Sequence, residues 1–186
     1  LGFSSNKHNK IDDRPYGGGP GMVMQAGPIL RAVQAAKRAM GRQKANVILF
    51  SAGGKQFNNA SASRLTKDYK HLILICGRYE GVDERIKKIL KDQKIKIEEL
   101  SIGPYVLTGG ELPAMILIDT VSRQLKGVLG KEESLEEKRL GAGVPVYTRP
   151  EIFTYRGKKY QAPKVLLSGD HAKILEWRKK HKKLAP

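Results

Sequence analysis

Small residues end three apolar segments of this chain. Residues 51–54 read Ser-Ala-Gly-Gly, Gly77 closes an apolar run, and residues 103–110 begin and end with glycine. In open α/β sheets ligands bind beyond the carboxyl ends of the strands, and glycine lets a backbone approach a ligand closely. Each loop taken alone is more simply a turn, but three at one sheet favour a nucleotide-like ligand.

The missing phosphate motifs narrow the kind of ligand. The sequence contains neither GxxxxGK[ST] nor GxGxxG, and its glycine run at 17–21 follows no expected strand. A nucleoside triphosphate or a dinucleotide is therefore disfavoured. A ligand with an adenosine part and no phosphates fits backbone-lined loops better, and S-adenosylmethionine is such a molecule.

Alternating strand and helix patterns must position these loops. Pro28 opens one helical pattern and Gly41 ends it, Ser61 or Ser63 is expected to cap a second helix, and Asp83 a third. The alternation predicts an α/β class with a mainly parallel sheet. Strands are expected at 47–50, 72–76 and 95–102, helices at 28–40, 61–68, 86–90, 111–125 and 175–183, and a hairpin at 152–161.

The charge of the chain points to a polyanion. The 186 residues carry 35 Lys and Arg against 18 Asp and Glu, a net charge of +17. This favours nucleic acid first and an anionic membrane surface second. No apolar run approaches the length of a membrane span. The chain has a single cysteine, Cys76, so a disulfide framework is excluded. We expect Cys76 to be a small buried apolar residue.

Five blocks, in order along the chain, carry a family resemblance. They are residues 12–22 (DDRPYGGGPGM), 76–85 (CGRYEGVDER), 101–114 (SIGPYVLTGGELPA), 147–151 (YTRPE) and 166–171 (LLSGDH). Together they resemble the bacterial tRNA (guanine-37-N1)-methyltransferase family, TrmD. The resemblance implies a cytoplasmic enzyme that methylates N1 of guanosine 37 in the tRNA anticodon arm, using S-adenosylmethionine.

The resemblance also implies an architecture. The family has the SPOUT fold, a parallel sheet flanked by helices with a C-terminal trefoil knot, and forms homodimers whose active sites are shared between subunits. We expect residues 1–170 to form the methyltransferase domain without its native N-terminal strand. Residues 171–186 would be a basic helical tail that starts a linker or appendage, with most of the family's C-terminal helical domain absent from this chain.

The resemblance implies that the three loops of small residues bind the cofactor. The family has Ser-Pro-Gln-Gly where this chain has residues 51–54, so contacts on the first loop depart from the family pattern. The expected cofactor residues are Ser51, Gly77, Tyr79, Ile102, Gly103, Pro104, Tyr105, Val106, Leu107, Gly109, Gly110 and Pro113.

Methyl transfer to guanine N1 requires a base and a cation. The N1 proton must leave, and the charge that then builds up on O6 needs stabilisation. Arg123 matches the family arginine with the second role. The family's aspartate base is missing after residues 130–134, where Glu137 is our candidate and Glu136 the alternative; either glutamate could instead lie on a solvated helix face.

Further residues match RNA- and metal-binding positions of the family. Asp12, Arg14, Ser134 and Arg149 would contact the tRNA, and Glu80 would contribute to a Mg²⁺ site. Two alternatives to an active enzyme stay open at this point. One is a catalytically impaired homologue that binds S-adenosylmethionine and tRNA, and the other is a SPOUT methyltransferase acting on another RNA.

Overall fold

A computed structural model describes residues 2–129 and 143–183 of the chain. The chain divides into two compact units, Leu1–Val128 and Leu129–Pro186. Within the described part of the chain no helix is long and apolar enough to cross a membrane. Each unit is described by itself.

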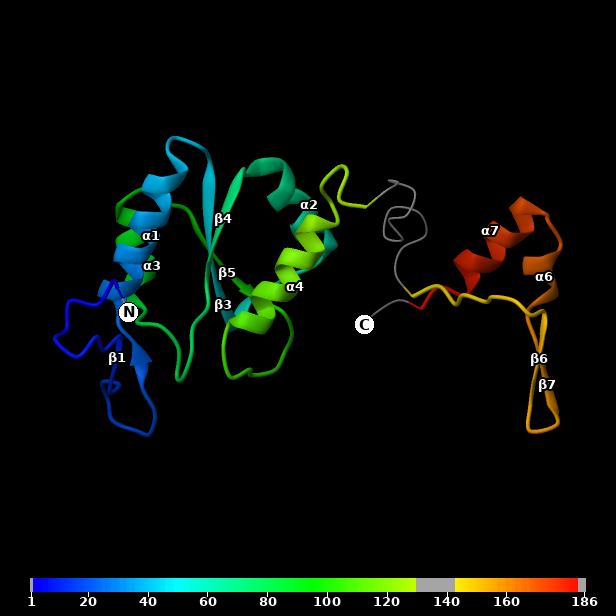
Figure 1. Ribbon diagram of the computed structural model, residues 1–186, viewed down its shortest axis with the longest axis horizontal. Helices are drawn as coiled ribbons and strands as arrows, with labels where there is room; N and C mark the ends of the chain where they lie inside the picture. The colour runs from blue at the N-terminus through cyan, green and yellow to red at the C-terminus, as the bar shows by residue number, and fades with distance from the viewer. Residues whose placement is uncertain (1, 130–142, 184–186) are drawn as a thin grey trace. The chain divides into compact units, whose positions relative to one another are not determined.

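The first unit is a three-layered α/β/α structure. Its sheet has the order β4-β3-β5, and both pairings are parallel. Figure 1 shows α1 and α3 on one side of this sheet and α2 and α4 on the other. The elements are β3 (Ala45–Gln56), β4 (His71–Ile75), β5 (Ile97–Ser101), α1 (Ala26–Met40), α2 (Asn59–Asp68), α3 (Arg85–Asp92) and α4 (Glu111–Ser122).

Two apolar clusters hold the layers together. On one face Val33 of α1 and Ile86 and Leu90 of α3 pack against Val47 and neighbouring strand residues. The other face buries a second cluster of Ile48, Phe57, Ala62, Leu65, Tyr69, Leu100 and Leu117. Alternate residues of the central strand thus face opposite layers, as the period-2 geometry of a strand requires.

The helix limits follow local capping chemistry. Gly41 has a left-handed φ of 65° and ends α1 as expected, whereas Pro28 lies in its first turn, not at its first residue. The expected cap of α2 was wrong. Asn58 takes that place, and its Oδ1 accepts the Ser61 backbone N–H at 2.9 Å. Asp83 accepts the Arg85 N–H at 3.0 Å, one residue ahead of the Glu84 cap position.

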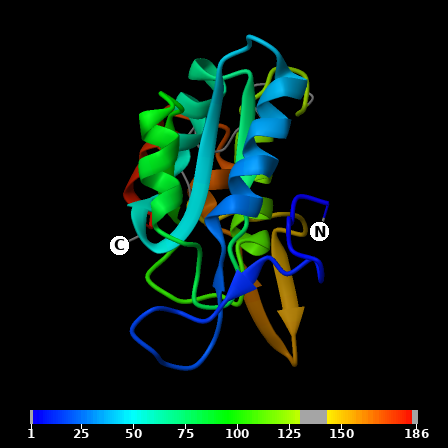
Figure 2. The same ribbon diagram turned by 90° about the vertical axis from the view of Figure 1, so that its left-hand side faces the viewer.

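A short antiparallel pair precedes α1, consisting of β1 (Asp12–Asp13) and β2 (Val23–Met24). Backbone hydrogen bonds join it to the segment after β4: the Glu80 N–H donates to Met22 O at 3.0 Å and the Met24 N–H to Gly81 O at 2.9 Å. Figure 2 shows this pair at the same end of the sheet as the loops that follow β4 and β5.

The described residues 143–183 of the second unit form a hairpin and two helices. β6 (Ile152–Tyr155) pairs with β7 (Lys158–Gln161), as expected from the sequence, and α6 (Lys164–Leu167) and α7 (His171–Lys180) follow. Asp170 caps α7 by accepting the N–H groups of Ala172 and Lys173. Trp177 stacks on His181, with ring centroids 4.2 Å apart.

Candidate functional site

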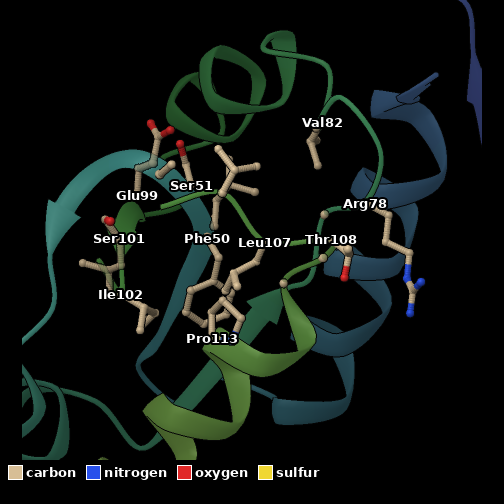
Figure 3. A pocket seen from close by; sticks show the side chains of 18 of the residues that line it. Phe50, Ser51, Arg78, Val82, Glu99, Ser101, Ile102, Leu107, Thr108 and Pro113 are labelled. Carbon is tan, nitrogen blue, oxygen red and sulfur yellow. The ribbon is translucent and has the colours of Figure 1, made fainter. Parts of the chain in front are cut away.

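A pocket of about 320 Å³ lies beyond the carboxyl ends of β4 and β5 and against residues 49–52 within β3. This is the edge of a parallel sheet at which ligands commonly bind. Figure 3 shows its walls, with Phe50, Leu107 and Pro113 on one side and Ser51 beside Glu99 on another. The main lining segments are residues 49–52, 77–82, 99–103 and 105–110, together with Glu84 and Pro113.

The first wall is a detour within β3. Leu100 of β5 pairs with both Phe50 and Lys55, so residues 51–54 bulge out of the ladder and the strand then resumes. Gly54 makes the return possible: a Cβ there would lie 2.8 Å from the backbone of Glu99 and Leu100. The strand predicted from the sequence ends at Phe50, and the observed strand continues to Gln56.

The second and third loops meet at the floor of the pocket. The Gly110 N–H donates to Gly77 O at 2.8 Å, and Arg78 forms an isolated bridge with Gly109. A Cβ on Gly110 would lie 2.5 Å from Cys76 Cα and 3.1 Å from Gly77 N, so only glycine permits this approach. Two segments far apart in sequence therefore form the floor of the pocket together.

A hydroxyl fixes the start of the third loop. The buried Ser101 Oγ donates a hydrogen bond to Gly103 O at 2.9 Å, and the Gly103 N–H donates one to Ser101 Oγ at 3.2 Å. The Tyr105 ring folds back over Gly103, where a side chain would collide with it. Val106 is 89% exposed, so the rim of the pocket carries an apolar side chain in solvent.

The charge of the pocket wall is acidic. Glu80, Glu84 and Glu99 line it. The hydrogen bond from Lys87 holds the pKa of Glu99 below its usual range, against the effect of burial and with help from Ser51. Lys87 Nζ lies 2.7 Å from the Glu99 carboxylate and 2.5 Å from that of Glu84. Glu99 is thus ionised at neutral pH at the edge of the cavity.

The cationic side chain of the pocket is directed elsewhere. Figure 3 shows the Arg78 guanidinium pointing away from the cavity, where its Nε donates to Glu111 Oε1 at 2.8 Å. Cys76 is no nucleophile in this setting, because burial raises the pKa of its thiol and so disfavours the thiolate. The cavity therefore offers backbone groups and carboxylates, not a phosphate-binding cluster.

The glycine-rich segment lies directly against the pocket loops. A Cβ on Gly21, whose φ is +90°, would run into the Glu80 side chain. Asp12 pairs with Met24 in β1 and β2, and Met24 bridges to Val82, a lining residue. The segment that carries Asp12 and Arg14 is thereby tethered to the rim of the cavity.

The comparisons with known proteins fit this geometry. The family model described as "tRNA (Guanine-1)-methyltransferase TrmD" matches residues 2–185. The chain belongs to this family. A Klebsiella pneumoniae protein named tRNA (guanine-N(1)-)-methyltransferase is 50% identical over 181 residues, covering 96% of this chain and 67% of the relative. A Dictyoglomus turgidum protein with that name is 49% identical over 181 residues, covering 96% of the chain and 68% of the relative.

Family membership bears out the recognition made from the five sequence blocks. The mixed α/β class with a parallel sheet flanked by helices is confirmed as well. All the cofactor residues expected from the sequence line the pocket except Pro104, which the structure does not bring into the lining. Their role in binding stays a prediction.

The catalytic and RNA candidates are spread more widely. Arg123 is the C-cap residue of α4, and about 18 Å of helix axis separates it from the first turn, which borders the pocket. Arg149 lies in the second unit, next to β6. Glu137, with the alternative Glu136, and Ser134 lie outside the described residues.

Sequence reasoning missed Glu99, the paired Arg78 and Thr108 as lining residues. An available signal for Glu99 was the pair of adjacent carboxylates at 98–99 inside an expected strand, which must point to opposite faces of the sheet. Glu98 faces the other layer and binds Arg64 and Asn46, whereas Glu99 faces Lys87 and the pocket.

Proposed function

We propose that this protein methylates N1 of guanosine 37 in tRNA, with S-adenosylmethionine as the methyl donor. The observation that carries the proposal is the glycine-built pocket at the Gly77–Gly110 contact, in a chain of the tRNA (guanine-N1)-methyltransferase family. Both relatives are named tRNA (guanine-N(1)-)-methyltransferase, which supports methylation of a tRNA guanine at N1.

The chemistry of the pocket suits S-adenosylmethionine. Gly77, Gly103 and Gly110 put no side chain between the backbone of the loops and the cavity, so a flat ring such as adenine can approach that backbone closely. Lys87 is shared by two carboxylates, Glu84 and Glu99, so this wall keeps a net negative charge that complements a cationic ligand and disfavours a phosphate. The donor supplies a methyl group activated on a sulfonium sulfur. The protein then has to position it and exclude water.

Two side chains would act on the guanine. A general base takes the N1 proton, and we assign this role to Glu137, with Glu136 as the alternative. Arg123 would stabilise the negative charge that develops on O6. Ser134 would contact the RNA beside the base.

Two subunits are needed to bring these groups together. Arg123 lies at the far end of α4 from the pocket of its own chain, so we propose that it serves the pocket of a second copy. The exposed face of α4 supports a homodimer, because a contiguous apolar surface of this kind marks an interface. Its exposed apolar side chains are Leu112, Met115, Ile116 and Ile118.

We further propose that the crossing at Gly110 and Cys76 belongs to the trefoil knot of the SPOUT fold. Their close backbone approach is what a chain threaded past its own loop requires. We keep residues 1–170 as the methyltransferase domain, because the assigned base lies beyond the first compact unit, and residues 171–186 as its basic tail.

The tRNA anticodon arm would meet the rim of the pocket. Asp12 and Arg14 lie on the segment tethered to Glu80 and Val82, and Arg149 adds a phosphate contact. By family resemblance Glu80 would contribute to a Mg²⁺ site. Among the described residues no group of three or more His, Cys, Asp or Glu gathers to hold a metal.

Transfer of labelled methyl from S-adenosylmethionine to a tRNA transcript with guanosine 37 tests the proposal. Arg123→Ala and Glu137→Gln should abolish transfer, whereas the exposed Arg42→Ala serves as the matched control and Glu136→Gln distinguishes between the two candidate bases. Full activity of Glu137→Gln would refute the base assignment. Intact S-adenosylmethionine binding without transfer by the wild-type chain would indicate the impaired homologue.

A further inference from the structure

The β6–β7 hairpin presents both of its faces to solvent. Cross-strand pairing sets Phe153 opposite Tyr160 and Tyr155 opposite Lys158, and every residue of both strands is exposed. Arg156 and Gly157 form the two-residue turn with φ values of 49° and 75°, as a tight hairpin requires. The ribbon buries nothing of its own, so its side chains are available to a partner.

Side chains alternate between the two faces of the hairpin, and the two faces differ in composition. Phe153, Tyr155 and Tyr160 share one face with Lys158, and the three rings are 57%, 53% and 49% exposed. The opposite face carries Ile152, Thr154, Lys159 and Gln161. We call the first set the aromatic face.

Cations accompany the rings of the aromatic face. Arg156 Cζ lies 5.3 Å from the centroid of Tyr155, and Lys158 Nζ lies 5.4 Å from that of Tyr160. Between residues 149 and 161 four basic side chains stand against Glu151 as the single acidic one. Glu151 is engaged by Gln161, whose Nε2 donates to it at 3.1 Å.

We propose that the aromatic face is a stacking platform for unpaired nucleotides of the tRNA substrate. This rests on the proposed function and adds a binding surface outside the pocket. Unstacked bases pack on exposed aromatic rings while nearby cations hold the phosphates, and this combination typifies single-stranded RNA sites. A protein partner fits less well, because lysine is depleted from the centres of protein interfaces.

Ring-specific variants separate stacking from general apolar packing. Phe153→Leu and Tyr160→Leu keep apolar bulk but remove the π face, whereas Tyr160→Phe keeps the ring. Fluorescence anisotropy of the full chain with a labelled anticodon stem–loop should show about tenfold weaker binding for each Leu variant. Tyr160→Phe and Ile152→Ala, on the opposite face, should bind like the wild type. A fully paired duplex of equal length should bind all five proteins alike.

Salt dependence adds a second readout. The Leu variants should leave the slope of log affinity against log salt unchanged, because no phosphate contact is lost. Lys158→Gln and Arg156→Gln should each reduce that slope by about 0.7. Far-UV circular dichroism and S-adenosylmethionine binding confirm that each variant is folded.

Three results would overturn the platform. They are equal losses on stem–loop and duplex, a change in sedimentation with unchanged RNA affinity, and no RNA binding by the wild-type chain. Failure of the proposed function is separate. A wild-type chain that binds the stem–loop in a ring-dependent way without transferring methyl would refute the enzyme and keep the platform. Leu variants that bind the stem–loop and transfer methyl like the wild type would refute the platform and keep the enzyme.

Discussion

The contact between Gly110 and Cys76 makes a sharp steric prediction for Gly110→Ala. The added Cβ would lie 2.5 Å from Cys76 Cα and 3.1 Å from both Cys76 C and Gly77 N. All three are backbone atoms, so no side-chain rotation can relieve the overlap. Gly110 has a φ of −81°, which alanine adopts without strain, and the effect is therefore purely steric.

The magnitude follows from the required displacement. Ordinary van der Waals contact begins at 3.4 Å, so one of the two loops must move by roughly 1 Å. Overpacking of this kind typically costs about 1–3 kcal/mol. A shift of that size also disturbs the Gly110–Gly77 hydrogen bond of 2.8 Å and the pocket floor that it holds. Misplacement by about 1 Å can cost a factor of about 100 in activity.

Urea unfolding and titration calorimetry with S-adenosylmethionine measure the two consequences. Gly53→Ala is the matched control, next to the lining residue Ala52, because a Cβ there meets only Ser51 Oγ at 3.8 Å. We expect Gly110→Ala to lose about 2 kcal/mol of unfolding free energy and at least tenfold in affinity, with Gly53→Ala near wild type. Equal behaviour of the two variants would refute the close crossing.

Three further perturbations follow from the described contacts. Burial raises the pKa of Glu98, but the hydrogen bonds from Arg64 and Asn46 outweigh it and lower the pKa overall. The ion pair between Glu98 and Arg64 therefore stabilises the fold above pH 4.5, and this stabilisation is lost as the pH falls through the lowered folded-state pKa of Glu98. Glu98→Gln should thus flatten the acid limb of a stability–pH profile. Asn58→Ala removes the α2 cap and should cost about 1 kcal/mol in urea unfolding; a loss under 0.2 kcal/mol would contradict the cap. Glu99→Gln should weaken binding of cationic S-adenosylmethionine by about threefold to tenfold more than that of its uncharged thioether product, and equal losses in calorimetry would argue against an electrostatic role.

Much of the fold was accessible from periodicity alone. The apolar run at 72–76 and the helical spacing after Pro28 are local signals, and both elements appear with limits shifted by one or two residues. The continuation of β3 beyond residues 51–54 was not accessible. It depends on pairing of Lys55 and Gln56 with β5, a contact between segments more than 40 residues apart.

In the candidate site, too, local features could be predicted from the sequence, whereas features that depend on distant segments could not. Its glycines stand out in the sequence because backbone approach leaves few alternatives to glycine. The charged wall does not, since the state of Glu99 depends on Lys87 of α3 and on Ser51 of the β3 detour. The α2 cap was missed for a simpler reason: serine and asparagine are both good caps, so residue type alone does not distinguish Asn58 from Ser61 or Ser63.

The most direct test of the central claim is nucleoside analysis of methylated tRNA. The wild-type chain is incubated with S-adenosylmethionine and transcripts that carry guanosine or adenosine at position 37, and the digested RNA is examined by mass spectrometry. We predict 1-methylguanosine from the guanosine transcript only, and none with Arg123→Ala. Methylation that persists with adenosine at position 37, or a methylated nucleoside other than 1-methylguanosine, would contradict it.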